Sequence, residues 1–450
     1  MKVYNTLTRK KEELEPMKPG KINMFVCGPT VNGSPHLGHA KTFIQFDFIV
    51  KYLRYKGYDV FYLQNITDID DKIIKKAAEE NISWLDVASG YEKEYREMME
   101  ALGVDSVTKY ANATEHIDEI ISQVKKLMEK EYAYETSDGI YYDVSKFKDY
   151  GKLSGRTELE EEDSVSRIDE GIDKRNWQDF CLWKFSEPGE PVWEADIGAG
   201  RPGWHIEDTA ITEKYFGPQY DIHGGAEDLI FPHHEAEISQ MEALSGKSPL
   251  VKYWLHTAFL NLQSKKMSKS KGNFMTINEA LETYDYRVLR LLFISTHYRT
   301  PLDFRKDVLK STQNTLEKID DFIFNINPDL EDTQNENIID RYRTLIIQSL
   351  DDNFDTPKAL ANFFDFTREI NASGSLGKNV KEFLEELNTF FGFFKLEFNL
   401  DEEEINDLVD KRDTLREQKK FEEADKIREQ LLEKGIKIYD TSQGTKWRRV

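Results

Sequence analysis

The strongest constraint on the fold is a strand–helix–strand pattern near the amino terminus. The apolar segment "INMFVC" (residues 22–27) is short and stops at a Gly-Pro pair, as a buried strand does. Residues 37–58 carry apolar side chains at helical spacing, and "DVFYLQNIT" (residues 59–67) has the composition of a second strand. Two strands joined by one long helix form a βαβ unit, which predicts a parallel sheet and an α/β fold.

The loop after the first strand is flanked by one thiol and two imidazole side chains. Cys27, one of only two cysteines in the chain, precedes this loop, and His36 and His39 open the following helix. Parallel sheets bind ligands at the carboxyl ends of their strands. A helix N-terminus offers free N–H groups and the positive end of the helix dipole, so this loop is a candidate phosphate site.

A second cluster lies in the segment "FPHHEAEISQ". If Pro232 starts a helix, His233 and Glu237 stand four residues apart on one face, where an imidazole and a carboxylate can share a tetrahedral metal. A His–Glu surface pair is the commoner explanation of such spacing, and Cys27 as a third ligand favours the metal. His234 points elsewhere on such a helix, which predicts packing or hydrogen bonding for it.

Composition narrows the class of protein. The 450 residues are enough for two to four domains, a hydrophobic share of 39% is typical of globular proteins, and no stretch approaches twenty apolar residues. The amino-terminal segment shows no export signal and two cysteines cannot build a disulfide framework, so we expect a cytoplasmic protein that is not bound to a membrane. The net charge is −22, but residues 411–450 carry twelve Lys and Arg against eight Asp and Glu. This basic segment is either a surface that binds a polyanion or an ordinary solvent-exposed helix face, and the charge alone does not distinguish the two.

The order of the periodic segments predicts three domains. Residues 1–300 are expected to form a Rossmann-like domain with an inserted connective region at about 83–200. Residues 301–398 are expected to form a helical bundle, because helical spacing continues almost without a break from residue 277. Residues 399–450 are expected to form a small C-terminal domain.

Local patterns fill in the first domain. Residues 83–135 are polar with helical spacing, "YAYETSDGIYYDV" (residues 132–144) predicts a hairpin, and the acidic residues 158–173 predict an exposed loop. The segments "YDIHGG" and "KYWLHTAFL" predict a return to the sheet. Cys181 is most simply a buried small hydrophobe.

Two short signatures point to a known class of enzyme. Lysine and serine alternate in "QSKKMSKSKGN", which on composition alone is a solvated basic loop. Its core "KMSKS" resembles the second signature of class I aminoacyl-tRNA synthetases, and "HLGH" resembles the first. "FVCGPTVNGSPHLGHA", "LQNITDIDDKI", "GRPGWHIE", "YDIHGGAEDLIFPHHEAEI", "DDNFDTPKAL" and the tail "ADKIREQLLEKGIKIYDTSQGTKW" resemble the cysteinyl-tRNA synthetase family over nearly the whole chain.

The resemblance implies a reaction in two steps and a set of site residues. L-cysteine would be activated by ATP with Mg²⁺ to cysteinyl-adenylate and then transferred to the 3′ end of cysteine tRNA. Most members of this family are monomers, so we expect a monomer. The implied residues are, for phosphate binding and catalysis, His36, His39, Lys266 and Lys269; for the ribose and base, Gly224, Gly225 and Asp228; and for the cysteine pocket, Thr67 and Trp204.

The resemblance also implies one zinc ion that binds the substrate sulfur. Carried over by position, its ligands are Cys27, Asp208, His233 and Glu237. The family usually reads "GWHIEC", whereas this chain reads "GWHIED", which places Asp208 where a second cysteine is expected. Aspartate is an accepted zinc ligand but a harder one than thiolate. The alternative is that Asp208 pairs with a base and the site is empty or three-coordinate. A smaller departure is His39, where many relatives have asparagine.

Two other functions remain to be weighed. A related ligase joins activated cysteine to an amino sugar. Such enzymes lack a tRNA-binding tail, whereas residues 424–447 of this chain resemble one. A non-catalytic tRNA-binding relative is expected to have lost signature residues, and both signatures are intact. We therefore favour the tRNA ligase.

Overall fold

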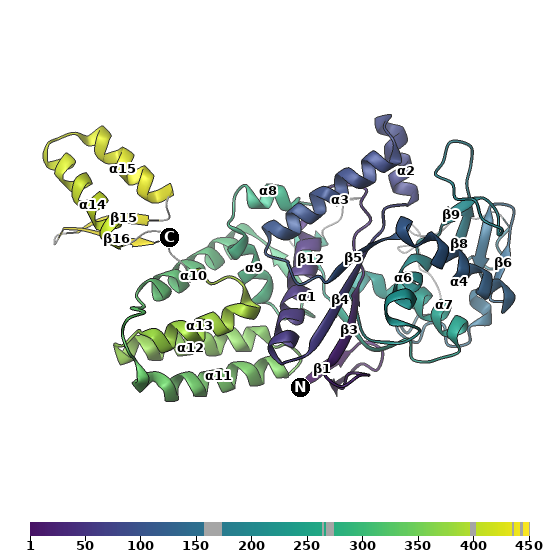
Figure 1. Cartoon of the computed structure of the whole chain (residues 1–450), viewed down its shortest axis with the longest axis horizontal. Coiled ribbons are helices and arrows are strands. Elements are labelled where there is room, and N and C mark those ends of the chain that lie inside the picture. Colours follow the sequence, from purple (N-terminus) through teal and green to yellow (C-terminus); the bar gives the residue numbers. More distant parts are fainter. Residues whose placement is uncertain are drawn as a thin grey trace. The chain divides into compact units, whose positions relative to one another are not determined.

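A five-stranded parallel sheet forms the centre of the fold (Figure 1). The strand order is β11 (Val251–Thr257), β10 (Tyr220–Ala226), β3 (Lys21–Val26), β4 (Asp59–Ile66) and β5 (Lys109–Asn112), and every neighbouring pair is parallel. This computed structural model describes residues 1–156, 173–262, 265–266, 274–396, 402–433, 436–441 and 444–449. The predicted α/β fold is confirmed.

The chain divides into two units. The first comprises Met1–Tyr286, Thr296–Phe304 and Asp351–Asp355, and the second comprises the remaining residues from Arg287 onward. The parallel sheet belongs to the first unit. The helices from α10 onward belong to the second.

The helix α1 (Leu37–Tyr55) connects β3 to β4 as the sequence predicts. It is buried on almost every side, including at Phe43, Phe46 and Leu53. The helix ends at Tyr55 rather than at residue 58, because Gly57 has a φ of +89° and turns the chain into β4.

A four-stranded antiparallel sheet occupies the connective region. Its order is β6 (Ala133–Glu135), β7 (Gly139–Tyr142), β8 (Phe180–Phe185) and β9 (Gly200–Pro202). The predicted hairpin is present as β6 and β7. Cys181 is buried on β8 against Tyr134 and Tyr141, as expected for a small hydrophobe. The predicted acidic loop at 158–173 lies outside the described residues, except for Asp173.

The helical prediction for residues 83–135 is only partly right. The helices α3 (Trp84–Ala101) and α4 (Ile117–Glu129) are present, but β5 lies between them and pairs with β4. A four-residue edge strand is too short to show a period of two, and its pairing with a distant segment decides its conformation. The main sheet therefore reaches into the region expected to be inserted.

The first unit contains further helices and strands. They are β1 (Lys2–Asn5), β2 (Lys10–Glu13), α2 (Asp71–Glu80), α6 (Ile206–Phe216), α7 (Glu235–Ser245), β12 (Leu260–Leu262), β13 (Lys265–Lys266), α8 (Ile277–Leu281) and β14 (Leu302–Phe304), with α9 (Tyr286–Ile294) leading into the second unit. These strands form a two-stranded sheet, β1–β2, and a three-stranded sheet, β13–β12–β14.

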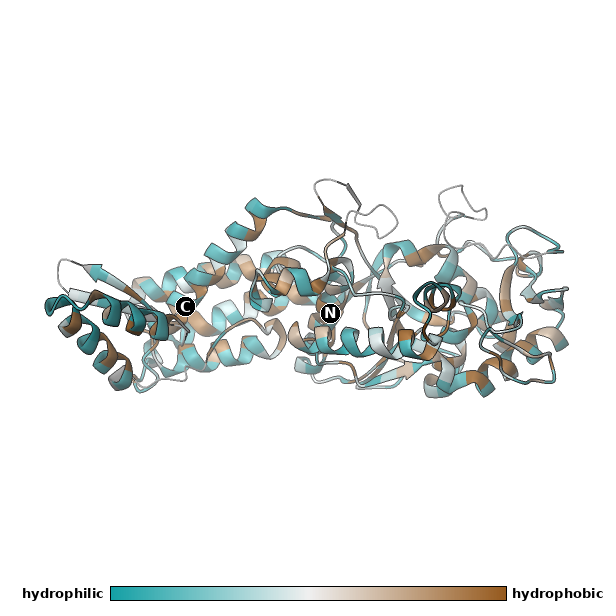
Figure 2. Cartoon of the chain, turned by 90° about the horizontal axis from the view of Figure 1, so that it is seen from above, coloured by the Kyte–Doolittle hydropathy of each residue, from teal (hydrophilic) through white to brown (hydrophobic). Residues whose placement is uncertain are grey.

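The second unit is a helical bundle with a small α/β module at its C-terminal end. The bundle contains α10 (Lys306–Phe324), α11 (Glu336–Asp351), α12 (Thr356–Ser373) and α13 (Lys378–Phe391), and the module contains α14 (Glu402–Glu417), α15 (Phe421–Glu433), β15 (Ile436–Thr441) and β16 (Gly444–Arg449). The phenylalanines of the run 390–394 are buried at the end of α13 and directly after it. Apolar and polar positions alternate along these helices (Figure 2). Among the helices that the structure describes, none is both long and apolar enough to cross a bilayer.

Candidate active site and metal centre

Cys27 follows the central strand β3 at the point where the strand order of the sheet reverses. The chain runs from β3 through β4 to β5 on one side, and β10 and β11 lie on the other. The Cys27 N–H donates to the Gly224 carbonyl on β10 at 3.1 Å. Gly28 must be glycine, because a Cβ there would lie 1.8 Å from the Asn65 carbonyl oxygen. The turn after β3 therefore opens at the position where open α/β sheets bind ligands.

The structure brings the four proposed zinc ligands together in one buried cluster. Cys27 Sγ lies 3.3 Å from Asp208 Oδ2, and His233 Nε2 lies 2.9 Å from Asp208 Oδ2 and 3.3 Å from Glu237 Oε1. Phe231 has extended backbone angles, so the helical turn begins at Pro232 as expected, and His233 and Glu237 keep their i, i+4 relation. One ligand atom from each of the four residues lies within 4.8 Å of the others.

The electrostatics of this cluster fit a divalent cation. Burial, with the charges of Asp208 and Glu237, raises the pKa of the Cys27 thiol, and burial also raises the pKa of Glu237. Asp208 Oδ1 is buried and has no hydrogen-bond partner among the described residues. A metal ion would provide that oxygen with a partner and stabilise the ionised forms of these ligands. The donor set of one sulfur, one nitrogen and carboxylate oxygens is one that zinc accepts.

Two histidines that the sequence did not assign to the site also point at Cys27. His234 Nε2 lies 3.1 Å and His223 Nε2 lies 3.3 Å from Cys27 Sγ. The expectation that His234 points away is therefore wrong, because the irregular turn before α7 redirects its ring. The only sequence signal for His223 is its position at the carboxyl end of β10, beside the turn after β3.

Trp204 and Thr67 lie beside the cluster. The Trp204 indole stacks on the His233 ring with centroids 4.1 Å apart. Thr67 is buried, and its hydroxyl donates to Glu207 Oε2 at 2.8 Å. Burial raises the pKa of Glu207, with a further contribution from Asp208. These side chains form an aromatic wall and a polar edge next to the proposed ligands.

His36 and His39 build the N-terminus of α1. The His36 side chain caps the helix by accepting from the Gly38 N–H at 3.1 Å, and the His39 ring stacks on the His36 ring with centroids 3.9 Å apart. Two imidazoles at the positive end of the helix dipole form a site suited to phosphate oxygens.

The chain that follows the second signature contacts this helix end. The Met275 carbonyl accepts from the Leu37 N–H, and the Pro35 carbonyl accepts from the Ile277 N–H, both at 3.0 Å. Lys266 lies on β13, paired with Asn261 of β12, and Lys269 lies outside the described residues. The chain that follows the "KMSKS" segment is thus tied to the "HLGH" helix.

The structure gives Gly224 and Gly225 of β10 a packing role. A Cβ on Gly224 would lie 2.5 Å from the Phe46 ring of α1, and a Cβ on Gly225 would lie 2.8 Å from the His234 ring. Asp228 lies in the 3₁₀ turn Glu227–Leu229 directly after β10. Close packing accounts for both glycines before any nucleotide is considered, and their nucleotide contact stays a prediction.

The buried Lys41 on α1 is expected to make stability depend on pH. Its Nζ donates to the Ala258 carbonyl at 2.6 Å, and burial lowers its pKa from 10.5 to about 7, against an opposing effect of Glu227. Between these values the unfolded chain binds the proton and the folded chain does not, so stability rises with pH across this window. In the wild type the free energy of unfolding should rise by up to about 1.4 kcal/mol per pH unit across this window, and Lys41→Met should remove that rise. Urea midpoints at pH 7, 8 and 9 measure the difference.

The matched control is Lys93→Met, because Lys93 is exposed on α3. This variant should keep the pH dependence of the wild type. Parallel pH profiles for Lys41→Met and the wild type would contradict the prediction.

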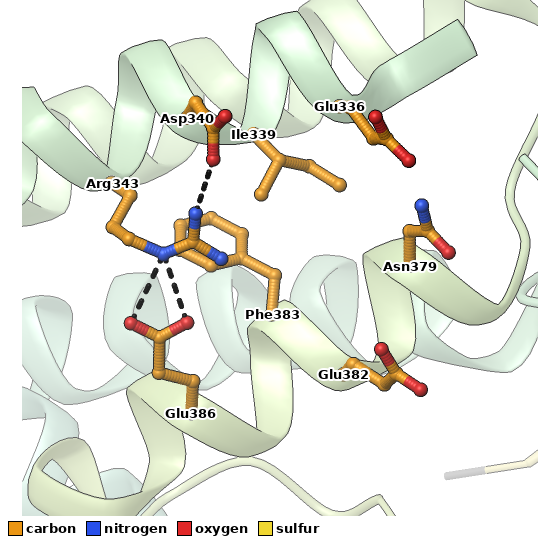
Figure 3. A pocket seen from close by; sticks show the side chains of 8 residues that line it. All are labelled: Glu336, Ile339, Asp340, Arg343, Asn379, Glu382, Phe383 and Glu386. Atoms are coloured by element: carbon orange, nitrogen blue, oxygen red, sulfur yellow. Dashed lines mark hydrogen bonds and ion pairs between the residues drawn. The ribbon is translucent and has the colours of Figure 1, made fainter. Parts of the chain in front are cut away.

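A separate groove in the helical bundle does not fit a phosphate ligand. It lies between α11 and α13 (Figure 3), and its polar lining contains four carboxylates and one guanidinium. That guanidinium, on Arg343, is already bound by Asp340 and Glu386. Negative lining repels a phosphate backbone, so the groove is not a candidate for nucleotide or RNA binding. The lining residues are Glu336, Ile339, Asp340, Arg343, Asn379, Glu382, Phe383 and Glu386.

Solved structures show which fold this is. The chain is similar to Mycobacterium tuberculosis methionyl-tRNA synthetase in complex with methionyl-adenylate, with a TM-score of 0.61 and 14% identity over 83% of this chain and 88% of that one. It is also similar to the LeuRS of Agrobacterium radiobacter K84 in a ternary complex, with a TM-score of 0.62 and 9% identity over 85% of each chain. At these identities the likeness concerns the fold alone, which is that of class I synthetases.

Sequence comparison gives the family. Family models described as "tRNA synthetases class I (C) catalytic domain", "DALR domain" and "Cysteinyl-tRNA ligase anticodon binding domain" match residues 13–314, 346–398 and 402–448. Proteins called cysteine–tRNA ligase are 47% identical in Thermoplasma acidophilum (99% of this chain, 100% of the relative), 45% in Thermococcus gammatolerans (100% and 99%) and 44% in Carboxydothermus hydrogenoformans (100% of both). With a matching catalytic-domain model over most of its length and such relatives over all of it, the chain belongs to the cysteinyl-tRNA synthetase family.

Proposed function

We propose that this protein activates L-cysteine with ATP and transfers it to the 3′ end of cysteine tRNA. The cysteine carboxylate attacks the α-phosphate of ATP, which gives cysteinyl-adenylate and pyrophosphate. The terminal ribose hydroxyl of the tRNA then attacks the acyl carbon and releases AMP. The observation that carries this proposal is the buried metal-ligand cluster at the switch point of the sheet, in a chain whose relatives are cysteine–tRNA ligases.

The first step needs positioning and charge stabilisation more than it needs a base, because a carboxylate is already a nucleophile. We assign the phosphates to the helix N-terminus with His36 and His39, and Mg²⁺ would accompany ATP. Lys266 and Lys269 would follow the charge that develops on pyrophosphate. Asp228, with the backbone at Gly224 and Gly225, would contact the ribose and base.

Selection of cysteine over serine is assigned to a zinc ion held by Cys27, Asp208, His233 and Glu237. Zinc takes a thiol as thiolate, whereas an alcohol is far less acidic and a harder ligand. Each tenfold preference needs only about 1.4 kcal/mol of transition-state difference. Trp204 and Thr67 would line the pocket that presents the substrate sulfur to the metal.

The C-terminal module is assigned to the tRNA. The family model matched there is described as an anticodon binding domain. Within the module, Arg412 and Arg416 are paired with Asp440, which lowers the pKa of that carboxyl. We propose the boundaries 1–300, 301–398 and 399–450 for the catalytic, bundle and anticodon-end domains.

Removing residues 400–450 should separate the two steps. Adenylate formation, measured as cysteine-dependent ATP–pyrophosphate exchange, should stay near the wild-type rate because the proposed active site lies in the first unit. Aminoacylation of cysteine tRNA should fall by about 100-fold or more, since the loss of several phosphate and base contacts weakens RNA binding by this order. Equal loss of both steps would mean that the module only supports the fold.

Full-length protein tests the proposed function itself. It should charge cysteine tRNA with cysteine in the presence of ATP, and serine should not replace cysteine. Robust exchange with transfer to an amino sugar and none to tRNA would instead support the related ligase. We further propose a monomer in the cytoplasm, which gel filtration and cell fractionation check.

A further inference from the structure

The helix α1, which begins with the "HLGH" signature, carries a buried polar strip in its second and third turns. Its members Lys41, Thr42 and Gln45 are 1%, 8% and 4% exposed. Burying an amine, a hydroxyl or an amide costs free energy unless the group is hydrogen-bonded, and apolar side chains pack in such places at lower cost. The strip therefore points to specific polar contacts that an apolar face could not make.

The partners of the strip lie where β11 ends and the chain passes on to β12. Lys41 Nζ donates to the Ala258 carbonyl at 2.6 Å and to Gln45 Oε1 at 3.1 Å. The Thr42 and Thr257 hydroxyls are hydrogen-bonded to each other at 3.0 Å. Both contacts are buried. The polar strip thus bonds the "HLGH" helix to the connection between β11 and β12.

That connection leads directly to the strand pair that carries Lys266. Asn261 on β12 pairs with Lys266 on β13. The bonded Ala258 lies three residues before Asn261, which is about 10 Å of extended chain, and β12 lies beside α1 (Figure 1). A shift of the peptide at Ala258 would therefore shift Lys266 relative to the helix that carries the two signature histidines.

Other bonds hold the same connection to the rest of the first unit. The Ala258 N–H donates to the Tyr298 carbonyl at 2.8 Å, and the Phe259 N–H donates to Glu227 Oε1 at 3.3 Å. Lys41 adds a bond from α1 on the carbonyl side of the peptide whose N–H side is held by Tyr298. The connection is thus fixed from both sides, and Lys41 is the side chain that refers it to the "HLGH" helix.

We propose that Lys41 is a positioning residue for adenylate formation: it holds the start of β12 against α1 and so places Lys266 relative to His36 and His39. This inference rests on the proposed function, in which the two histidines bind the phosphates of ATP and Lys266 follows the charge on the leaving pyrophosphate. Groups that act on one reacting phosphate must keep their spacing to about 0.5 Å, which requires such support from neighbouring side chains.

Lys41→Met in the full-length protein tests this role, because methionine keeps an unbranched side chain and removes the N–H donors. We expect kcat for cysteine-dependent ATP–pyrophosphate exchange to fall about tenfold and the KM for ATP to change by less than about threefold. Zinc content should equal that of the wild type, since Lys41 lies outside the metal-ligand cluster. An unchanged kcat in the folded variant would overturn the inference.

A double-mutant cycle with Lys266→Ala distinguishes positioning from general support of the fold. If Lys41 acts through Lys266, Lys41→Met should lower kcat by less than about threefold in a protein that already lacks the Lys266 side chain. A larger fall in that background would show that Lys41 acts independently of Lys266, which overturns the inference and leaves the proposed function intact. A wild type without cysteine-dependent exchange would instead overturn the proposed function, and the inference with it.

Lys51→Met is the matched control, because Lys51 lies on the same helix and its Nζ also donates to a backbone carbonyl, that of Gly103, at 3.1 Å. Gly103 lies before β5 and not next to β12. The control should therefore change kcat by less than about twofold with Lys266 present or absent. A tenfold fall in the control would mean that any loss of an anchor on α1 lowers kcat, and the specific role of Lys41 would be overturned.

Thr42→Val provides a second reading if Lys41→Met does not fold. Valine keeps the shape of threonine and removes the hydroxyl that is bonded to Thr257. We expect kcat to fall about threefold, and Lys266→Ala should abolish that fall. With circular dichroism showing a folded protein, an unchanged kcat in Thr42→Val would then overturn the inference.

Discussion

Cys27→Ser is expected to remove zinc and to lower cysteine-dependent pyrophosphate exchange by about 1,000-fold, since loss of the metal–sulfur interaction removes several tenfold steps of about 1.4 kcal/mol each. Cys27 is the residue that supplies sulfur to the metal-ligand cluster. The serine hydroxyl that replaces it is a hard donor that does not ionise near neutral pH. Zinc per chain should fall from one to near zero. ATP binding should change little, because the phosphates are assigned to the separate helix end at His36.

The second cysteine is the control for this variant. Cys181 is buried on β8 in the antiparallel sheet, packed against tyrosines. Cys181→Ser should keep full zinc content and near-normal exchange, with a small loss of thermal stability from the buried hydroxyl. Full zinc content in Cys27→Ser would remove Cys27 from the ligand list.

Lys269→Ala is expected to lower kcat for adenylate formation by about 100-fold and to change the KM for ATP by less than about threefold. A charge that pairs with the leaving pyrophosphate stabilises the transition state more than it stabilises bound ATP. The effect should therefore appear in kcat and in kcat/KM together.

Lys265→Ala is the matched control, because Lys265 lies four residues before Lys269 and outside the signature. It removes the same charge from the same segment and should leave kcat within a factor of a few. A raised KM for ATP with kcat unchanged in Lys269→Ala would assign Lys269 to ground-state binding.

Much of the catalytic fold could be predicted because its elements carry strong local periods. β3, α1 and β4 form a βαβ unit within three residues of the predicted bounds. The edge strand β5 was missed because a four-residue strand carries no period, and only its pairing with β4 defines it.

The metal centre shows a different limit of sequence reasoning. His233 and Glu237 could be paired because residues four positions apart lie on the same face of a helix. His234 could not be placed, because the extended angles of Phe231 put it in an irregular turn that directs its ring at Cys27. His223 reaches the cluster only because β10 lies beside β3, and that adjacency is a property of the whole sheet.

The carboxylate next to Cys27 also changes how this centre responds to oxidants. Two neighbouring thiolate ligands can be oxidised to a disulfide, which releases the zinc and leaves a covalent bond between them. Here the neighbour of Cys27 Sγ at 3.3 Å is an oxygen of Asp208, and Cys181 is buried in another sheet. Without bound cysteine, direct oxidation of Cys27 therefore gives a sulfenic acid on a single sulfur, which an external thiol can reduce. The Asp208 departure leaves the proposed metal site with no second protein thiol to which Cys27 could be cross-linked.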